Sequence, residues 1–229
     1  MPSRKPSKQK ILRFREELLK WAATHGREYP WRKTRDSYRI LVAELMLRRT
    51  RSEQVVSVYS RFIKRFPTLD SLATSPKTTI KRVLYPLGLE QRADQMASFA
   101  AEATARYGRR LPASPVELRQ IRGVGDYVAN AVACFSASAP LAFVDVNVAR
   151  VLGRVFGVQR AVDWRYADVR TRGALVSIAS RCVPKNDPRT YYYALLDFGA
   201  MVCRPNPSCP ECPMQRARIC DYCRTVRRR

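Results

Sequence analysis

The chain has 229 residues, of which 46% are hydrophobic and 27% charged, which is ordinary for a globular protein of one or two domains. Its formal net charge of +24 is not ordinary, and it indicates a polyanionic partner, because basic side chains gain free energy by releasing counterions from phosphates. No apolar run is long enough to cross a bilayer, which excludes a helical membrane protein.

A nucleic acid is the partner that this charge favours, and a merely basic solvated surface, a membrane surface or an acidic protein are the alternatives. The chain begins with a basic, polar arm, residues 1–8, without the apolar stretch of a secretory signal. We therefore expect an intracellular protein, cytoplasmic and nucleoid-associated, with reduced thiols and no membrane partner.

Apolar residues recur at helical spacing through most of the chain, and no segment shows the alternation typical of strands. Residues 29–32 are expected to form a loop, and Ser114, Pro115 and Glu117 form a capping-box pattern that opens a short helix. The sequence therefore predicts an all-α protein, with helices at residues 9–25, 37–49, 53–66, near 71, 77–84, 92–107, 126–138, 147–156, 167–181 and 190–202.

A very short turn with two glycines joins the helix after Ser114 to the next helix. The turn consists of Gly123, Val124 and Gly125. Glycine permits positive φ and a close backbone approach, and the amides of Val124, Gly125 and the next residues would point outward, where they can bind a phosphate. Packing turns of this kind are common, so the turn alone does not decide for DNA binding.

Asp145 is a lone carboxylate in an apolar segment that opens the following helix, where a simple N-cap is one interpretation. Its context adds another, because residues 118–157 resemble the signature of the helix-hairpin-helix DNA glycosylases, the endonuclease III and MutY superfamily. The resemblance extends over nearly the whole chain and is closer to the archaeal thymine mismatch glycosylases called MIG, at residues 29–36, 43–50, 66–68 and 196–200.

This resemblance implies a two-domain helix-hairpin-helix glycosylase fold. A six-helix barrel domain at 35–139 would carry the hairpin, and residues 1–34 with 140–229 would form a second helical domain that ends in a cysteine cluster. A DNA cleft would lie between the two domains. The resemblance also implies that the hairpin binds the DNA backbone and that Asp145 lies at the mouth of a base pocket.

Breaking a nucleoside C1′–N bond builds positive charge on the sugar, which a carboxylate such as Asp145 can stabilise. Glu44 stands alone in an apolar segment, where desolvation would raise its pKa and suit it to donate a proton to the base. A solvent-facing position on an amphipathic helix is the alternative for Glu44. Glycosylases of the MutY and MIG type carry a glutamate at this position, and that likeness favours the pocket.

Four further positions take their roles from the resemblance. Arg48 and Arg49 follow Glu44, and one of them, preferably Arg49, would fill the gap left by the flipped base; a phosphate contact is the alternative. Tyr127 occupies the position where bifunctional relatives have a lysine that forms a Schiff base, and a phenol cannot form one. The protein should therefore be monofunctional. Tyr127 and the Asp145-x-Asn147 pattern favour the MIG type and assign Asn147 to the DNA-binding set.

Asp126 is a departure from the family pattern. It follows the hairpin directly, where relatives often have a basic residue, and it should weaken a phosphate contact unless it turns away to cap the helix.

Five of the seven cysteines crowd into the last 27 residues: Cys203, Cys209, Cys212, Cys220 and Cys223. In a reducing compartment this spacing indicates a metal site, whereas Cys134 and Cys182 are expected to be small buried hydrophobes. By resemblance a [4Fe–4S] cluster would be held by Cys203, Cys209, Cys212 and Cys220, with two gaps differing from the family spacing and Cys223 as the competitor for the fourth place. A structural zinc at Cys209, Cys212, Cys220 and Cys223 is the alternative.

The expected function is that of a monomeric glycosylase that removes T or U opposite G from double-stranded DNA in base excision repair and leaves an abasic site. The alternatives are an adenine glycosylase of the MutY type, whose additional domain we expect to be absent, a modified-pyrimidine glycosylase, and a non-catalytic DNA-binding module.

Overall fold

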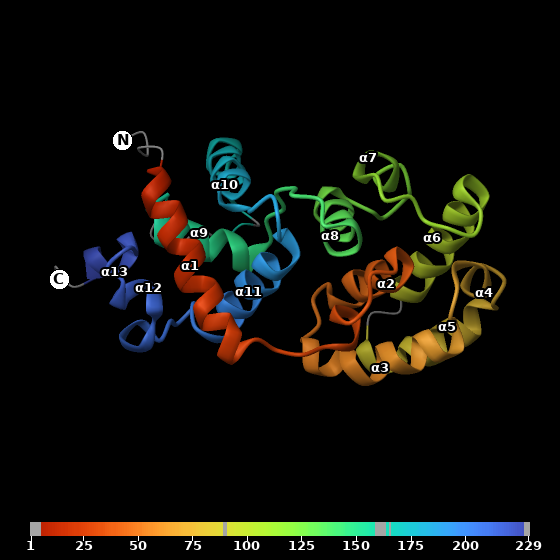
Figure 1. Cartoon of the computed structure of the whole chain (residues 1–229). Coiled ribbons are helices and arrows are strands. Elements are labelled where there is room, and N and C mark those ends of the chain that lie inside the picture. Colours follow the sequence, from red (N-terminus) through yellow and green to blue (C-terminus); the bar gives the residue numbers. More distant parts are fainter. Residues whose placement is uncertain (1–5, 89–90, 159–163, 165, 227–229) are drawn as a thin grey trace. The chain divides into compact units, whose positions relative to one another are not determined.

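The computed structural model describes residues 6–88, 91–158, 164 and 166–226 (Figure 1). The described residues contain helices, turns and loops and no strand, which confirms the predicted all-α class. They divide into two compact units, one of residues 28–139 and one that joins 1–27 to 140–229. No helix in the described part of the chain is both long and apolar enough to cross a membrane.

The unit of residues 28–139 is built around α2, Ser37–Leu47, which packs against α8, Asp126–Ala137, and α3, Ser52–Arg65. All residues of α2 from Ile40 to Met46 are buried, so this helix is a core element rather than an amphipathic surface helix. The other elements of this unit are η1 (Pro30–Arg32), α4 (Leu69–Ala73), α5 (Lys77–Leu84), η2 (Tyr85–Leu87), α6 (Gln91–Tyr107) and α7 (Pro115–Leu118).

The second unit is built around α11, Pro188–Met201, which packs against α1, Lys8–His25, and α9, Val146–Phe156. Figure 1 shows α1 beside α11, although more than 160 residues of chain separate the two helices, from His25 to Pro188. The remaining elements are α10 (Val169–Cys182), η3 (Cys209–Glu211), α12 (Pro213–Arg216) and α13 (Asp221–Val226).

Most helix ends predicted from the sequence lie within two residues of those in the structure, and the larger differences have identifiable causes. The second helix ends at Leu47 instead of Arg49, because Arg48 is extended and Arg49 has a φ of 59°. Residues 30–32 form a 3-10 turn where a loop was expected. Ser114 precedes α7, but its side chain makes no cap hydrogen bond, so the predicted capping box is wrong.

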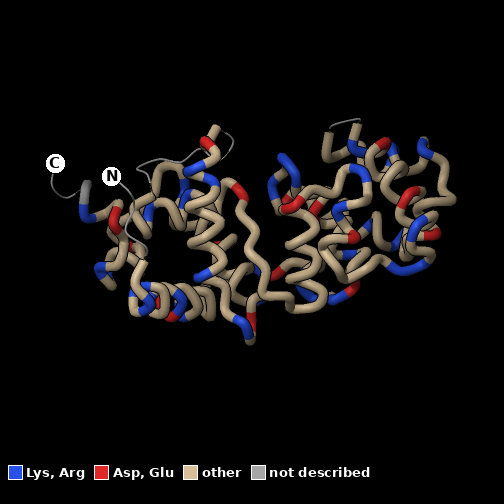
Figure 2. The backbone as a smooth tube through the Cα atoms, turned by 90° about the horizontal axis from the view of Figure 1, so that it is seen from above, with Lys and Arg blue, Asp and Glu red and all other residues tan. Residues whose placement is uncertain are grey.

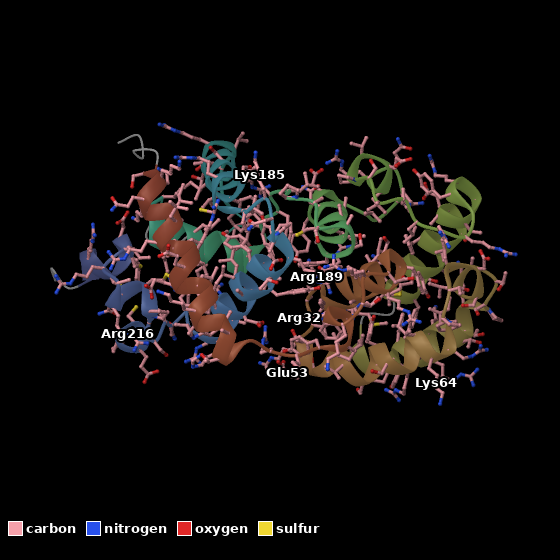
Figure 3. The ribbon with its side chains drawn as sticks, viewed as in Figure 1. Arg32, Glu53, Lys64, Lys185, Arg189 and Arg216 are labelled. Atoms are coloured by element: carbon pink, nitrogen blue, oxygen red, sulfur yellow. The ribbon has the colours of Figure 1, made fainter. Side chains whose placement is uncertain are left out.

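The third helix shows how terminal charges complement a helix dipole. Glu53 lies in its first turn, and Lys64 and Arg65 lie in its last turn. Figure 3 shows Glu53 and Lys64 at opposite ends of α3. The hydroxyl of Tyr29 donates a hydrogen bond to Glu53 Oε1 at 2.9 Å, and this bond connects the segment before α2 to the start of α3.

Candidate active site and cysteine cavity

Asp145 is the N-cap of α9, which confirms the N-cap interpretation of this residue. Its Oδ1 accepts a hydrogen bond from the Val148 amide at 2.7 Å, and its Oδ2 lies 3.4 Å from Asn147 Nδ2. Desolvation nevertheless raises the pKa of Asp145, and these hydrogen bonds and the charge of Arg150 only partly counteract it. A carboxylate whose ionised form is left under-stabilised is typical of a functional site rather than of a cap alone.

Arg150 links this carboxylate to the cysteine segment. Its Nε donates to the carbonyl oxygen of Cys203 at 2.7 Å, and its Nη2 donates to Asn147 Oδ1 at 2.6 Å and to the carbonyl oxygen of Gly199 at 2.8 Å. A hydrogen-bonded path therefore runs from Cys203 through Arg150 and Asn147 to Asp145. Sequence reasoning missed Arg150, although its position three residues after Asn147 on the same helix face was a usable signal.

Gly199 allows the close approach of α11 to the first turn of α9. A Cβ at this position would lie 2.9 Å from Asn147 Cβ and 3.4 Å from Val151 Cγ2. The glycine in the motif of residues 196–200 is therefore required by packing directly beneath Asn147.

In the unit of residues 28–139, Glu44 is 6% exposed, so the solvent-facing alternative for this residue is wrong. Tyr127 lies partly buried in the first turn of α8, which packs against the helix that carries Glu44. The structure therefore brings Glu44 and Tyr127 onto two packed helices of one unit. Asp145 belongs to the other unit.

Arg48 and Arg49 are exposed in the turn after α2, and the buried Arg92 hydrogen-bonds to this turn. Arg92 is only 4% exposed and donates through Nη2 to the carbonyl oxygen of Arg48 at 2.8 Å and to Thr50 Oγ1 at 2.9 Å. These bonds hold the Arg48 carbonyl group and the Thr50 side chain on either side of Arg49, which adopts the left-handed conformation that L-residues rarely take. Sequence reasoning did not find Arg92.

Gly123 of the hairpin has the expected positive φ, but the Val124 amide is not available to a ligand. Gly123 has a φ of 87°, and Gly125 is the N-cap of α8. The Val124 amide donates to the carbonyl oxygen of Ile121 at 3.1 Å, and Val124 is buried, so the expectation that its amide points outward is wrong. The first amides of α8, which follow Gly125, are the remaining candidates for a phosphate contact.

Two side-chain contacts further define the hairpin. Asp126 does not cap the helix: its Oδ1 lies 3.2 Å from Arg119 Nη1, so the departure from the family pattern forms an exposed ion pair. Arg48 Nη1 lies 3.5 Å from the carbonyl oxygen of Gly123, which brings the turn after α2 to the hairpin. Figure 2 shows Lys and Arg distributed over both units.

All five C-terminal cysteines line one cavity of the second unit. Arg154 of α9 lines it too; this buried side chain binds the carbonyl oxygens of Arg204 and Pro205, places Nη1 3.5 Å from Cys203 Sγ, and leaves its Nε without a hydrogen-bond partner. Converging thiols beside a buried cation with an unused N–H donor fit an anionic thiolate-ligated group. Among the described residues, no group of three or more His, Cys, Asp and Glu is arranged to hold a metal ion.

The other two cysteines, Cys134 and Cys182, are buried apart from this cavity, as predicted. His25 is the last residue of α1, and its ring stacks on Trp21.

The all-α fold with a glycine hairpin between two helices and a carboxylate capping the next helix defines a helix-hairpin-helix protein. The family model described as "HhH-GPD superfamily base excision DNA repair protein" matches residues 42–167, an interval that contains Glu44, the hairpin, Tyr127 and Asp145. The chain therefore belongs to this superfamily.

Similar proteins cover almost the whole chain. A thymine-DNA glycosylase of Aeropyrum pernix is 37% identical over 221 residues, which is 94% of this chain and 96% of that protein. A thymine/uracil-DNA glycosylase of Methanothermobacter thermautotrophicus is 33% identical, over 91% of this chain and 92% of the relative. The solved structure of a thermostable thymine-DNA glycosylase superposes with a TM-score of 0.85 at 32% identity, and covers 95% of this chain and 98% of the other.

Proposed function

We propose that the protein is a monofunctional DNA glycosylase that hydrolyses the N-glycosidic bond of a thymine or uracil opposite guanine and leaves an abasic site. The names of three relatives that match this chain over most of their own length support this base preference. The observation that carries the chemistry is Asp145, a carboxylate with a raised pKa that is held by the first turn of α9 and by Asn147.

Asp145 would act on the sugar. As the C1′–N bond breaks, positive charge develops on the sugar, and a partly buried carboxylate such as Asp145 interacts with that charge more strongly than a fully hydrated one does. Ionised Asp145 also accepts from its own hydrogen-bond donors, which fixes its position before the base departs. Both polar atoms of the Asn147 amide are engaged within the protein, so we propose that Asn147 positions Asp145 instead of contacting DNA.

Glu44 would act on the departing base. Glu44 is buried in the core helix α2, and from there its carboxyl group would donate a hydrogen bond or a proton to a pyrimidine oxygen as negative charge builds on it. Tyr127, in the first turn of the helix packed against α2, would line the same pocket. A phenol offers no amine for a Schiff base, so water is the nucleophile and the DNA strand stays intact.

The DNA would be held by backbone contacts from several elements. The amides that open α8 would bind a phosphate, and the exposed Arg48 and Arg49 would meet the duplex, with Arg49 filling the space of the extruded base. We propose that the protein acts as a monomer on double-stranded DNA.

The cysteine cavity would hold a [4Fe–4S] cluster through Cys203, Cys209, Cys212 and a fourth thiolate, for which Cys220 is the first candidate; a structural zinc is the alternative. When bound, the group would crosslink the segments around η3, α12 and α13. This chain's own contribution is Arg154, whose charge and hydrogen bonds hold the loop at residues 203–205.

Base release from a panel of duplexes tests the proposal. Thymine or uracil should be released from G·T and G·U pairs by the wild type and not by Asp145→Asn, and both proteins should bind the duplex. Release of adenine opposite 8-oxoguanine, or only of a modified pyrimidine, would move the enzyme to one of the alternative substrates. Binding without release from any duplex would identify a non-catalytic module.

A further inference from the structure

The cysteine cavity contains one thiol more than a four-thiolate group requires. Cys203, Cys212, Cys220 and Cys223 are each 6–8% exposed, and Cys209 is half-buried. All five line the same cavity, so none of them has been left on an outer surface. The family pattern that the sequence resembles uses four cysteines, and the spacing differs most at Cys220, which follows Cys212 after seven intervening residues.

Cys220 and Cys223 reach the cavity from one short segment. Cys220 immediately precedes α13, and Cys223 lies three residues later, in the first turn of that helix. Positions three apart on a helical turn project to the same side, so both side chains can face one cavity without a change in the backbone.

The two thiols have different neighbours on the protein side. The Cys220 Sγ donates toward the carbonyl oxygen of Arg154 at 3.7 Å, and the amides of Tyr222 and Cys223 hydrogen-bond to the same sulfur. Cys223 hydrogen-bonds through its side chain to both Cys220 and Cys209. Cys223 therefore contacts both Cys220 and Cys209, and it lies within the group of thiols that lines the cavity.

The segment that carries both thiols is anchored at Asp221, the first residue of α13. Lys10 Nζ lies 2.8 Å from Asp221 Oδ1, and Asp221 also packs against Gly157, where an added Cβ would lie 2.8 Å from Asp221 Oδ2. This anchor lies between Cys220 and Cys223 in the chain, so it keeps both residues at the cavity whichever of them is bound.

We propose that Cys220 and Cys223 are interchangeable fourth ligands, and that the cavity retains its iron–sulfur group when either thiol is lost. Either Cys220 or Cys223 would supply the fourth thiolate, and the other would remain a protonated thiol in the cavity, so changing from one to the other needs no oxidant or reductant. This inference rests on the proposed cluster but not on the proposed base specificity.

The test compares alanine variants of the full chain, because alanine removes the ligand whereas serine could bind iron through oxygen. Wild type, Cys220→Ala, Cys223→Ala and the double variant are purified without air, with Cys212→Ala as the matched control, because Cys212 lies on a different segment from Cys220 and Cys223. Iron and sulfide per chain and the visible absorption of the cluster are measured, and circular dichroism reports helix content.

Each single variant at positions 220 and 223 should retain the iron content and visible spectrum of the wild type. The double variant and Cys212→Ala should lose most of both. The proposal is overturned if one single variant loses as much iron as the double variant, which would make that cysteine a dedicated ligand. It is also overturned if the wild type contains zinc or no metal. Should a single alanine variant fold poorly, Cys220→Val and Cys223→Val repeat the comparison, because valine also removes the ligand and fills more of the buried position. Loss of iron in only one of the two valine variants refutes interchangeability.

Discussion

Arg150 offers the sharpest test of the path between the cysteine segment and Asp145. Replacing it with methionine keeps most of the stem and removes three hydrogen bonds of 2.6–2.8 Å from a charged donor. Such bonds contribute about 1.5–3 kcal/mol each, but the site is half-buried and water can replace part of the loss. We expect the free energy of unfolding to fall by about 2–4 kcal/mol, because two carbonyl oxygens and the Asn147 amide lose their donor.

The same change should move the pH dependence of base release. Arg150 is one of the groups that lower the pKa of Asp145 against the dominant effect of desolvation. Without that charge the pKa of Asp145 rises further, so the ionised fraction, and with it activity, should be lost at a higher pH than in the wild type. Arg150→Lys keeps the charge but not the forked geometry, so it should lower stability and turnover without shifting the acid limb as far.

Single-turnover base release across the acid pH range, together with urea unfolding, measures both effects. Arg13→Met, at an exposed position of α1, is the matched control and should behave as the wild type. An unchanged acid limb and unchanged stability in Arg150→Met would refute the role given to this residue.

Four further predictions follow from single contacts. Asp145→Asn should lower turnover by about 10³-fold or more. Because burial raises the pKa of the Asp145 carboxyl, its ionised form destabilises the folded protein at any pH above the pKa of the unfolded chain, so Asp145→Asn should be at least as stable as the wild type at pH 7. Asp145→Ala, which also removes the helix cap, should instead cost about 1 kcal/mol of stability. Gly199→Ala should destabilise by about 1–3 kcal/mol in thermal unfolding and reduce turnover, because its Cβ meets Asn147 at 2.9 Å; unaltered melting would contradict the packing argument. Tyr127→Lys should allow borohydride trapping on DNA that the wild type does not show, and trapping of the wild type would disprove the monofunctional assignment. Arg92→Met should slow base release more than it weakens duplex binding, because it frees the turn at Arg49; equal losses in both would point to general unfolding instead.

Much of this protein was determined by local sequence. Helical periodicity predicted the all-α class and most helix ends, because the 3.6-residue repeat of burial is written into each segment. The glycines of the hairpin and the cap at Asp145 were predictable for the same reason, since positive φ and N-capping involve only neighbouring residues. The charge of +24 indicated the kind of partner, and the crowding of five cysteines indicated a common site.

Other features depend on contacts between distant segments, and only the tertiary structure decided them. Glu44 is buried because α8, about 80 residues later, covers α2, and the turn at Arg49 is fixed by Arg92 from another helix. The path from Cys203 to Asp145 requires α11 and α9 to approach at Gly199. A sequence pattern places residues on one face of one helix, but it does not say which face of a distant helix meets them. For that reason the sequence could identify Asp145 and the cysteines, whereas the structure was needed to show that Arg150 joins them and that Cys223 shares their cavity.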